Sequence, residues 1–294
     1  MSDLLLVTGA AGHLGQRVIH HLLDTLKVPA SRIIATSRKP DSLSALAERG
    51  VIVRAADFAD AASLAGTFAG ANRMLLISTD AIGHRLPQHR NAIAAAVEAG
   101  VSHVVYTSMP APEGSPVLFA PEHAGTEAAL ASSSLPGWTV LRNHWYFENL
   151  FMSLPSVLAM GGQWFSAAGD GKLANIARDD LARAAAVVLA DNSTGKATYT
   201  LSGAEALTTA QQAQAVSQAI GRPIQVIPVP VEALVQGMIG AGIPEAMARI
   251  VASFDISTAA GEAGTVTSDF KAITGIEPQS FSRWLDANKA ALAA

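Results

Sequence analysis

The sequence predicts an α/β protein built on a doubly wound parallel sheet of the Rossmann type, with a smaller α+β lobe at the C-terminal end. Three observations support this fold class. The apolar strand 4–7 runs directly into a turn with three glycines, and this turn opens a helix with Leu14, Val18 and Leu22 on one face. Strands then alternate with helices through the first half of the chain. With 294 residues and 50% apolar content, the chain can fill a large core.

The glycine turn, Thr8 to Gly15, has the composition of a diphosphate-binding loop. Glycines at positions 9, 12 and 15 let the turn tighten and let backbone N–H groups approach an anion at the positive end of the helix dipole. The spacing Gly-x-x-Gly-x-x-Gly departs from the strict dinucleotide fingerprint, so a purely structural turn is the alternative. The sequence leaves open whether the bulky His13 contacts a diphosphate or points away.

The second strand, 32–37, is followed by residues that distinguish between the two nicotinamide dinucleotides. An acid in this position binds the 2′-hydroxyl of the adenosine ribose, whereas a basic residue suits the 2′-phosphate of NADPH. The chain has Ser37, Arg38 and Lys39 here and no acid, which favours NADPH as the cofactor. The alternative is that Arg38 is a solvated cation at a strand end.

Polar residues also follow the next two strands. The third strand, 51–53, ends near Asp57, where such folds contact adenine, and Asp60 is expected to cap the helix that follows. The fourth strand, 74–77, leads into Ser78 and the residues after it. Small polar residues at the carboxyl end of a central strand suit the crevice where ligands bind in open α/β sheets.

The remaining elements extend to the C-terminus. We expect Asp179 to cap one helix, and Thr209 with Gln212 to form the capping box of the next. Further helices are expected at 88–99, 122–131 and over most of 231–294, and further strands at 103–108, 138–141, 198–201 and 224–229. We place an NADP-binding Rossmann domain at residues 1–148 and a small substrate-side lobe at 149–294, with the helix and strand near 179–203 returning to the Rossmann sheet.

Composition excludes several other classes of protein. The net charge of -4 gives no reason to expect nucleic acid as a partner. The chain has no cysteine and no pair of histidines at the spacing of metal ligands, so no metal is expected. Residues 149–169 carry no charge, but Pro155 and Gly161 interrupt them, which favours a pocket-lining segment over a membrane span. Without a signal sequence, a cytoplasmic location is expected.

Several motifs resemble those of the NmrA-like branch of the short-chain dehydrogenase/reductase superfamily, and within it the quinone and triphenylmethane reductases. The glycine turn is common to the superfamily. The more specific pieces are 28–31, 85–91, 106–108, 168–172 and, above all, Leu-Arg-Asn-x-Trp-Tyr-x-Glu-Asn at 141–149. The resemblance covers nearly the whole chain. It departs from the family pattern at His13, His144 and Phe147.

The resemblance and the residue patterns together give a set of expected cofactor contacts. They comprise the glycine turn, the basic position after the second strand, the ends of the third to fifth strands and the block after the sixth. The set is Gly9, Ala10, Ala11, Gly12, His13, Leu14, Arg38, Asp57, Ser78, Asp80, Ala81, Ile82, Thr107, Arg142, Asn143, His144, Trp145, Tyr146 and Phe147.

The usual acid/base pair of the superfamily, Tyr-x-x-x-Lys, is absent, because His123 and Glu127 stand in those two places. Sugar epimerase and alcohol dehydrogenase chemistry, which need that pair, are therefore disfavoured. The resemblance implies hydride transfer from NADPH to a quinone or a similar electron-poor conjugated acceptor. The candidate catalytic residues are Asn143, Tyr146 and His123, with Tyr146 or Trp145 as a wall of the acceptor site.

Two alternatives stay open at the level of sequence. An azo or triphenylmethane dye reductase would use the same hydride donor with a larger apolar slot. A non-enzymatic regulatory protein of the NmrA type would sense NADP(H) without turnover, and the missing acid/base pair suits it equally. Turnover with a small quinone separates the enzyme from the regulator. The expected partner is a small quinone-like molecule, and a homodimer is left open.

Overall fold

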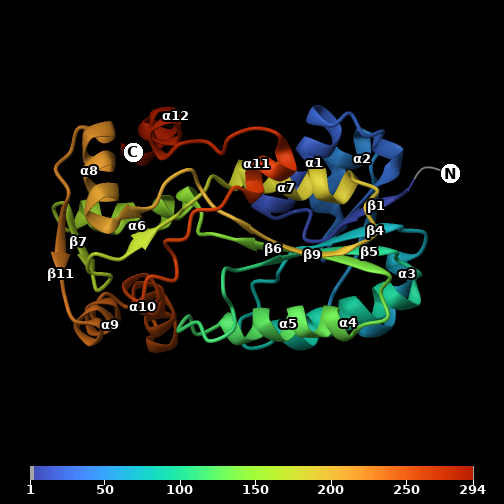
Figure 1. Ribbon diagram of the computed structural model, residues 1–294, viewed down its shortest axis with the longest axis horizontal. Coiled ribbons are helices and arrows are strands. Elements are labelled where there is room, and N and C mark those ends of the chain that lie inside the picture. The colour runs from blue at the N-terminus through green and yellow to red at the C-terminus, as the bar shows by residue number, and fades with distance from the viewer. Residues whose placement is uncertain (1–2, 294) are drawn as a thin grey trace.

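The computed structural model describes residues 3–293 and contains a central sheet of seven parallel strands (Figure 1). Their spatial order is β3-β2-β1-β4-β5-β6-β9, so the chain winds outwards from β1 in one direction and from β4 in the other. The predicted doubly wound sheet is confirmed. The strands are β1 (Leu5–Val7), β2 (Ile33–Ser37), β3 (Ile52–Ala55), β4 (Arg73–Leu76), β5 (His103–Ser108), β6 (Gly137–Asn143) and β9 (Lys196–Leu201).

Helices cover both faces of this sheet (Figure 1). Successive residues of a strand point to opposite faces, so Leu5 and Val7 pack in one apolar core while Leu6 lies in the other. One face carries α1 (His13–His20), α2 (Ser44–Glu48), α7 (Arg178–Ala190) and α11 (Asp269–Thr274). The opposite face carries α3 (Ala61–Phe68), α4 (Arg85–Glu98) and α5 (Ala120–Ser132).

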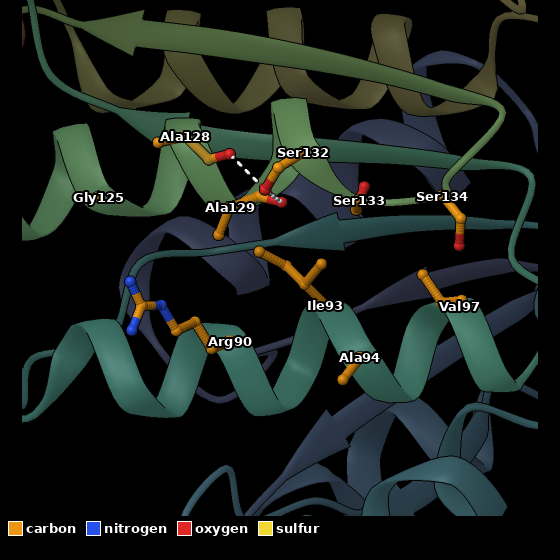
Figure 2. A pocket seen from close by; sticks show the side chains of 10 residues that line it. All are labelled: Arg90, Ile93, Ala94, Val97, Gly125, Ala128, Ala129, Ser132, Ser133 and Ser134. Atoms are coloured by element: carbon orange, nitrogen blue, oxygen red, sulfur yellow. Dashed lines mark hydrogen bonds between the residues drawn. The ribbon is translucent and has the colours of Figure 1, made fainter.

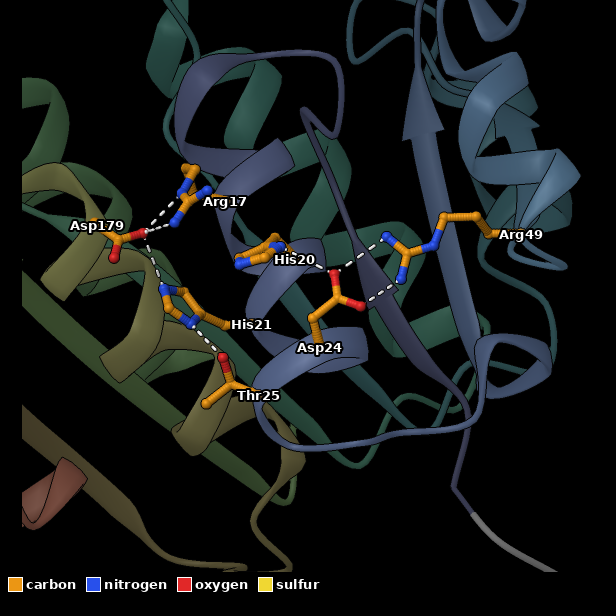
Figure 3. Close-up of polar contacts among 7 residues, drawn as sticks. All are labelled: Arg17, His20, His21, Asp24, Thr25, Arg49 and Asp179. Carbon is orange, nitrogen blue, oxygen red and sulfur yellow. Dashed lines mark hydrogen bonds and ion pairs between the residues drawn. The ribbon is translucent and has the colours of Figure 1, made fainter.

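A carboxylate links α1 to α7 (Figure 3). Asp179 in the first turn of α7 accepts a hydrogen bond from Nε of Arg17 at 2.7 Å and lies 3.0 Å from Nε2 of His21. His21 opens a π-helical turn, η1 (His21–Thr25), that continues α1. Asp179 was predicted to cap α7. That prediction is wrong, because the N-cap position is Ala177 and the carboxylate is directed at the neighbouring helix.

The other end of α7 is held by a buried arginine from β4. The guanidinium of Arg73 donates hydrogen bonds to the carbonyl oxygens of Leu189, Ser193 and Val188 at 2.9, 2.9 and 3.1 Å. The last turn of a helix leaves carbonyl groups unpaired and carries the negative end of the dipole, so a cation is stabilised there. Arg73 therefore joins the first half of the sheet to the segment that leads into β9.

The C-terminal elements beyond the main sheet form smaller layers. β7 (Gln163–Ser166) pairs in parallel with β11 (Gln225–Pro228), and β8 (Lys172–Leu173) pairs antiparallel with β10 (Leu207–Thr208). The helices here are α6 (Leu150–Ala159), α8 (Thr209–Ile220), α9 (Val231–Gly240), α10 (Glu245–Ala259) and α12 (Phe281–Ala293). Short 3-10 turns occupy η2 (Ala30–Arg32), η3 (Pro40–Leu43) and η4 (Phe147–Asn149). Over residues 3–293, no helix is long and apolar enough to cross a membrane.

Local signals at the helix ends differ from the expectations by small shifts. The capping box of α8 is made by Thr208 and Gln211, one residue earlier than predicted. Asp60 occupies the N-cap position of α3, but its side chain makes no capping hydrogen bond. α4 begins at Arg85 rather than 88, because a proline in the first turn, Pro87, is compatible with a helix.

Candidate active site at the carboxyl edge of the sheet

The glycine turn between β1 and α1 has the shape of an anion cradle. Gly9 adopts a φ of 59°, and a Cβ on Gly15 would overlap with the carbonyl oxygen of Gly9 and lie 2.8 Å from Cα of Ala10. Only glycine permits this close approach of helix to loop. Gly12 occupies the N-cap position of α1 without a side-chain capping bond. The positive end of this helix is therefore open to a diphosphate.

The other residues of the turn divide into interior and exposed positions. The side chains of Ala10 and Leu14 are buried in the core, so only their backbone faces the turn. His13 is the first residue of α1 and its side chain is exposed. Its side chain is therefore not packed in the core.

The adenosine end of the expected cofactor site is lined by exposed side chains. Arg38 follows β2 directly and is exposed, as a contact to a 2′-phosphate requires. Asp57, after β3, is also exposed, although its Oδ1 accepts a hydrogen bond from the backbone N–H of Ala59 at 2.9 Å. Both residues lie beyond the carboxyl ends of neighbouring strands, which pair from Ile34–Ile52 to Ser37–Ala55.

The ends of β4 and β5 meet through a side chain. The hydroxyl of Thr107 accepts a hydrogen bond from the N–H of Ser78 at 2.9 Å, which fixes the backbone where the chain leaves β4. Beyond it Asp80 and Ile82 are exposed, and Ala81 is partly buried. The Thr107 hydroxyl is thus a positioning group for the loop 78–82, and the exposed side chains of that loop are available to a ligand.

The end of β6 presents a buried amide with an unused acceptor. Asn143 is 7% exposed, and within the described chain its Oδ1 has no hydrogen-bond partner. An unpartnered buried amide oxygen is costly, and a donor on a bound ligand would satisfy it. Tyr146 lies nearby in sequence with Cζ of Arg178 5.2 Å from its ring centroid. Burial raises the pKa of Tyr146, so its hydroxyl stays protonated at neutral pH.

Two residues of the same block point into the interior. His144 is 1% exposed, and in residues 3–293 neither ring nitrogen finds a hydrogen-bond partner. Burial lowers its pKa to about 4. Phe147 packs against Phe281 and Trp284, with ring centroids 5.0 and 5.6 Å away. These positions do not favour contact between a cofactor and the side chains of His144 and Phe147.

The predicted cofactor residue Arg142 is engaged by the residue that replaces the superfamily lysine. Its Nε and Nη2 donate to the two carboxylate oxygens of Glu127 at 3.1 and 2.6 Å. Ser108, the last residue of β5, donates to the same carboxylate at 2.6 Å. The hydrogen bonds to Glu127 raise the pKa of Arg142. The pair therefore leaves only part of the guanidinium for a ligand, on a side chain that is one-quarter exposed.

His123 is fully engaged inside the protein. Its Nδ1 lies 2.8 Å from the hydroxyl of Tyr106, and its Nε2 lies 3.0 Å from Nη1 of Arg85. Because arginine only donates, Nε2 is the acceptor and Nδ1 carries the proton. Burial first, and then the charge of Arg85, lower the pKa of His123 to about 3. A neutral ring with both nitrogens bonded favours a positioning role over protonation of a product.

The sequence does not predict a role for three further residues near this edge, Arg85, Phe119 and Phe254. Arg85 stands over the ring of Phe119, with Cζ 5.1 Å from the ring centroid. Phe254 of α10 contacts Trp145, with ring centroids 4.6 Å apart. Arg85 opens the family-like segment 85–91 and Phe119 lies in a proline-containing loop, which are weak signals. Phe254 has no local signal, because its neighbours are distant in sequence.

A groove of about 590 Å³ lies elsewhere, between α4 and α5 (Figure 2). Its lining is mostly small or apolar, including Ala94, Val97 and Ala129, with Arg90 at one end. None of the expected cofactor residues lines it. The groove is therefore not the candidate active site.

The chain is similar to known proteins over most of its length. The NmrA-like family matches residues 1–285. The chain is 39% identical to Quinone oxidoreductase 2 of Escherichia coli over 88% of this chain and 89% of that protein. The structure of an Escherichia coli NADPH-dependent quinone oxidoreductase complexed with NADPH superposes with a TM-score of 0.91 at 36% identity, covering 97% of this chain and 99% of that one. Triphenylmethane reductase of Citrobacter sp. gives a TM-score of 0.86 at 33% identity, covering 98% and 99%.

The family match spans nearly the whole chain. The resemblance noted in the sequence is thereby confirmed. The chain belongs to the NmrA-like family.

Proposed function

We propose that this protein is an NADPH-dependent reductase that transfers hydride to a quinone or a similar electron-poor conjugated acceptor. The observation that carries the proposal is the likeness, over nearly the whole chain, to a quinone oxidoreductase whose structure contains NADPH. The site geometry supports it, because the open N-terminus of α1 and the exposed Arg38 suit the diphosphate and the 2′-phosphate of that cofactor.

The proposal divides the work between two parts of the chain. Residues 1–148 bind the cofactor, and residues 149–294 supply much of the substrate side. Bound NADPH would supply a hydride, and a quinone that takes it up together with one proton from water becomes the hydroquinone. Asn143 and Tyr146 orient the reacting partners, with the free Oδ1 of Asn143 as an acceptor for a ligand N–H or O–H.

The side chains of His123 and Glu127 are both hydrogen-bonded to other protein groups, and this arrangement favours a quinone over a simple ketone as the acceptor. Reduction of a ketone needs an acid at the substrate oxygen, and His123 is neutral, buried and bonded at both nitrogens. The hydroquinone anion is a much weaker base than an alkoxide and takes its proton from solvent. The chain therefore needs to provide orientation and an apolar slot rather than a strong acid.

Rapid mixing tests the proposal. Purified protein, NADPH and a small benzoquinone are combined, and loss of absorbance of the reduced nicotinamide is followed. We expect oxidation well above the spontaneous rate. A rate equal to that without protein would contradict the enzyme and favour the NADP(H)-sensing regulator. A panel with azo and triphenylmethane dyes then ranks the acceptors by kcat/KM.

Assembly and location complete the proposal. Monomer and homodimer are both left open, and sedimentation velocity of the purified chain distinguishes them. A cytoplasmic location is expected as well, and fractionation of the producing cells, with detection of this chain, tests it.

A further inference from the structure

Three aromatic rings from distant segments meet beside the candidate site. Phe119 immediately precedes α5, Trp145 follows β6, and Phe254 lies in α10. The ring centroids of Trp145 and Phe254 are 4.6 Å apart, those of Phe119 and Phe254 are 5.7 Å apart, and those of Phe119 and Trp145 are 6.3 Å apart. All three rings are only partly buried. We call these three residues the aromatic cluster.

The aromatic cluster lies at the edge of the sheet where ligands bind. β5 ends at Ser108 and β6 at Asn143, and Trp145 is the second residue after that end. In open parallel sheets the ligand site lies outside the carboxyl ends of the strands. The three rings pack against a small buried cluster of Met109, Val117 and Ala120, and the part of their surface that stays exposed is available to a ligand.

Phe254 is held from both sides along its own helix. The hydroxyl of Ser253 accepts a hydrogen bond from the N–H of Leu118 at 3.2 Å. The carboxylate of Asp255 accepts from the hydroxyl of Ser166 at 2.9 Å and from the N–H of Ala167 at 2.6 Å. Two consecutive anchors to different segments fix the backbone on either side of Phe254, so little conformational entropy remains to be lost when a ligand contacts its ring.

Phe119 is fixed by the buried polar network. Arg85, whose Cζ lies 5.1 Å from the Phe119 ring centroid, donates from Nε to the carbonyl oxygen of Thr79 at 2.7 Å and contacts His123 through Nη1. The cation holds one side of the ring by a cation–π contact. Arg85 thus connects the hydrogen bonds around His123 to Phe119 of the aromatic cluster.

From this arrangement we infer that Phe254 determines acceptor specificity: with Trp145 and Phe119 it forms a wall against which a flat, uncharged quinonoid ring stacks. The inference rests on the proposed function for the identity of the acceptor. Offset or edge-to-face aromatic contacts contribute about 0.5–1.5 kcal/mol beyond area burial, which corresponds to a factor of about 2 to 12 in binding. The C-terminal part of the chain thereby selects the acceptor through a residue that does not touch the glycine turn.

Binding without turnover tests the inference. Duroquinone is titrated into the protein in the absence of NADPH, and quenching of tryptophan fluorescence gives the Kd. The variant W145F shows how much of the quenching arises from Trp145. We expect F254A to raise the Kd about fivefold, and F254Y to bind as the unaltered protein does. L26A, which truncates an exposed apolar side chain at the end of η1, is the control and should leave the Kd unchanged.

The outcomes separate the two proposals. An unchanged Kd in F254A, with F254Y also unchanged, overturns the role of Phe254 whatever the turnover. A protein that binds duroquinone through Phe254 but does not oxidise NADPH supports the wall and contradicts the reductase. If F254A does not fold, F254L keeps the bulk without the ring, and a Kd raised about twofold or more supports the inference while an equal Kd overturns it.

Discussion

Arg142 and Glu127 meet in parallel, Nε on one carboxylate oxygen and Nη2 on the other, at the carboxyl edge of the sheet. The bidentate geometry is the strongest form of an ion pair in a protein. The Glu127 side chain is 12% exposed and that of Arg142 25%, so solvent screens the pair only in part. The Glu127 carboxylate also accepts a hydrogen bond from the hydroxyl of Ser108, which positions the end of β5.

The substitution Glu127→Gln should therefore destabilise the fold. It removes the charge that Arg142 needs while keeping the size of the side chain, and we expect the free energy of unfolding to fall by about 2 kcal/mol. The midpoint of urea unfolding measures this. Glu205→Gln, a change of the same type at an exposed residue, should shift the midpoint little. Equal midpoints for the two variants would show that the pair adds nothing to stability.

Arg38→Asp tests the choice of cofactor. If the guanidinium meets the 2′-phosphate, replacing it by an acid should raise the Kd for NADPH about 30-fold, whereas the Kd for NADH should change less than about twofold. Titration of reduced-nicotinamide fluorescence gives both constants. Arg222→Asp makes the same charge change at an exposed arginine beyond α8 and is the control. A similar loss for both cofactors would place Arg38 away from the phosphate.

Gly15→Ala tests the glycine turn. The added Cβ would overlap with the carbonyl oxygen of Gly9, so helix and loop must separate. We expect about 2 kcal/mol lower stability and weaker binding of both NADPH and NADH. Gly66→Ala is the matched control, because a Cβ there meets no atom within 4 Å in helix α3. That variant should gain up to about 1 kcal/mol. A Gly15→Ala protein as stable and as tightly binding as the parent would contradict the close contact.

His144→Leu tests a buried histidine without partners. The pKa of His144 in the fold is about 4, below its ordinary 6.5, so the unfolded chain binds the extra proton first. Its contribution to stability is complete above pH 6.5 and is lost as pH falls towards 4. We expect His144→Leu to keep or raise stability at pH 7 and to flatten the acid loss in this window, as thermal unfolding between pH 7 and 4 would show.

His123→Leu is the contrasting variant. It removes a ring whose two nitrogens contact Tyr106 and Arg85, so it leaves buried polar groups unpaired and should cost about 2–3 kcal/mol at pH 7. If His144→Leu proved as destabilising as His123→Leu, the two histidines would not differ in the way that their contacts indicate.

The sheet could be predicted from sequence because its signals are local. Each buried strand is a short apolar run, and a turn residue follows it, so seven strands and their alternation with helices were readable. The contacts of residues that depend on a partner far away in the sequence were harder to predict. Asp179 has the sequence of a cap, but its carboxylate is drawn to Arg17 and His21, which lie far away in the chain.

Some positions of the candidate site could also be predicted from local sequence, and others could not. Glycine in the turn and a cation after the second strand act through their own backbone or charge, so sequence predicts their place. The directions of His144 and Phe147 could not be predicted, because the two-residue alternation of a strand ends with β6 at Asn143. Beyond Asn143 the backbone forms an isolated parallel β-bridge between Tyr146 and Ile176. No local pattern in the sequence predicts this pairing. Phe254 joins the site only through tertiary packing.

The buried Arg73 has a consequence for synthesis on the ribosome. Its three carbonyl partners, on Val188, Leu189 and Ser193, are translated more than a hundred residues after it. A nascent chain that ends before them leaves the Arg73 guanidinium bonded to water, and burying it at that stage would remove the water without supplying the carbonyl oxygens. Packing of the incomplete sheet around Arg73 is therefore unfavourable at that stage. We infer that the core reaches its final packing only after α7 has been synthesised.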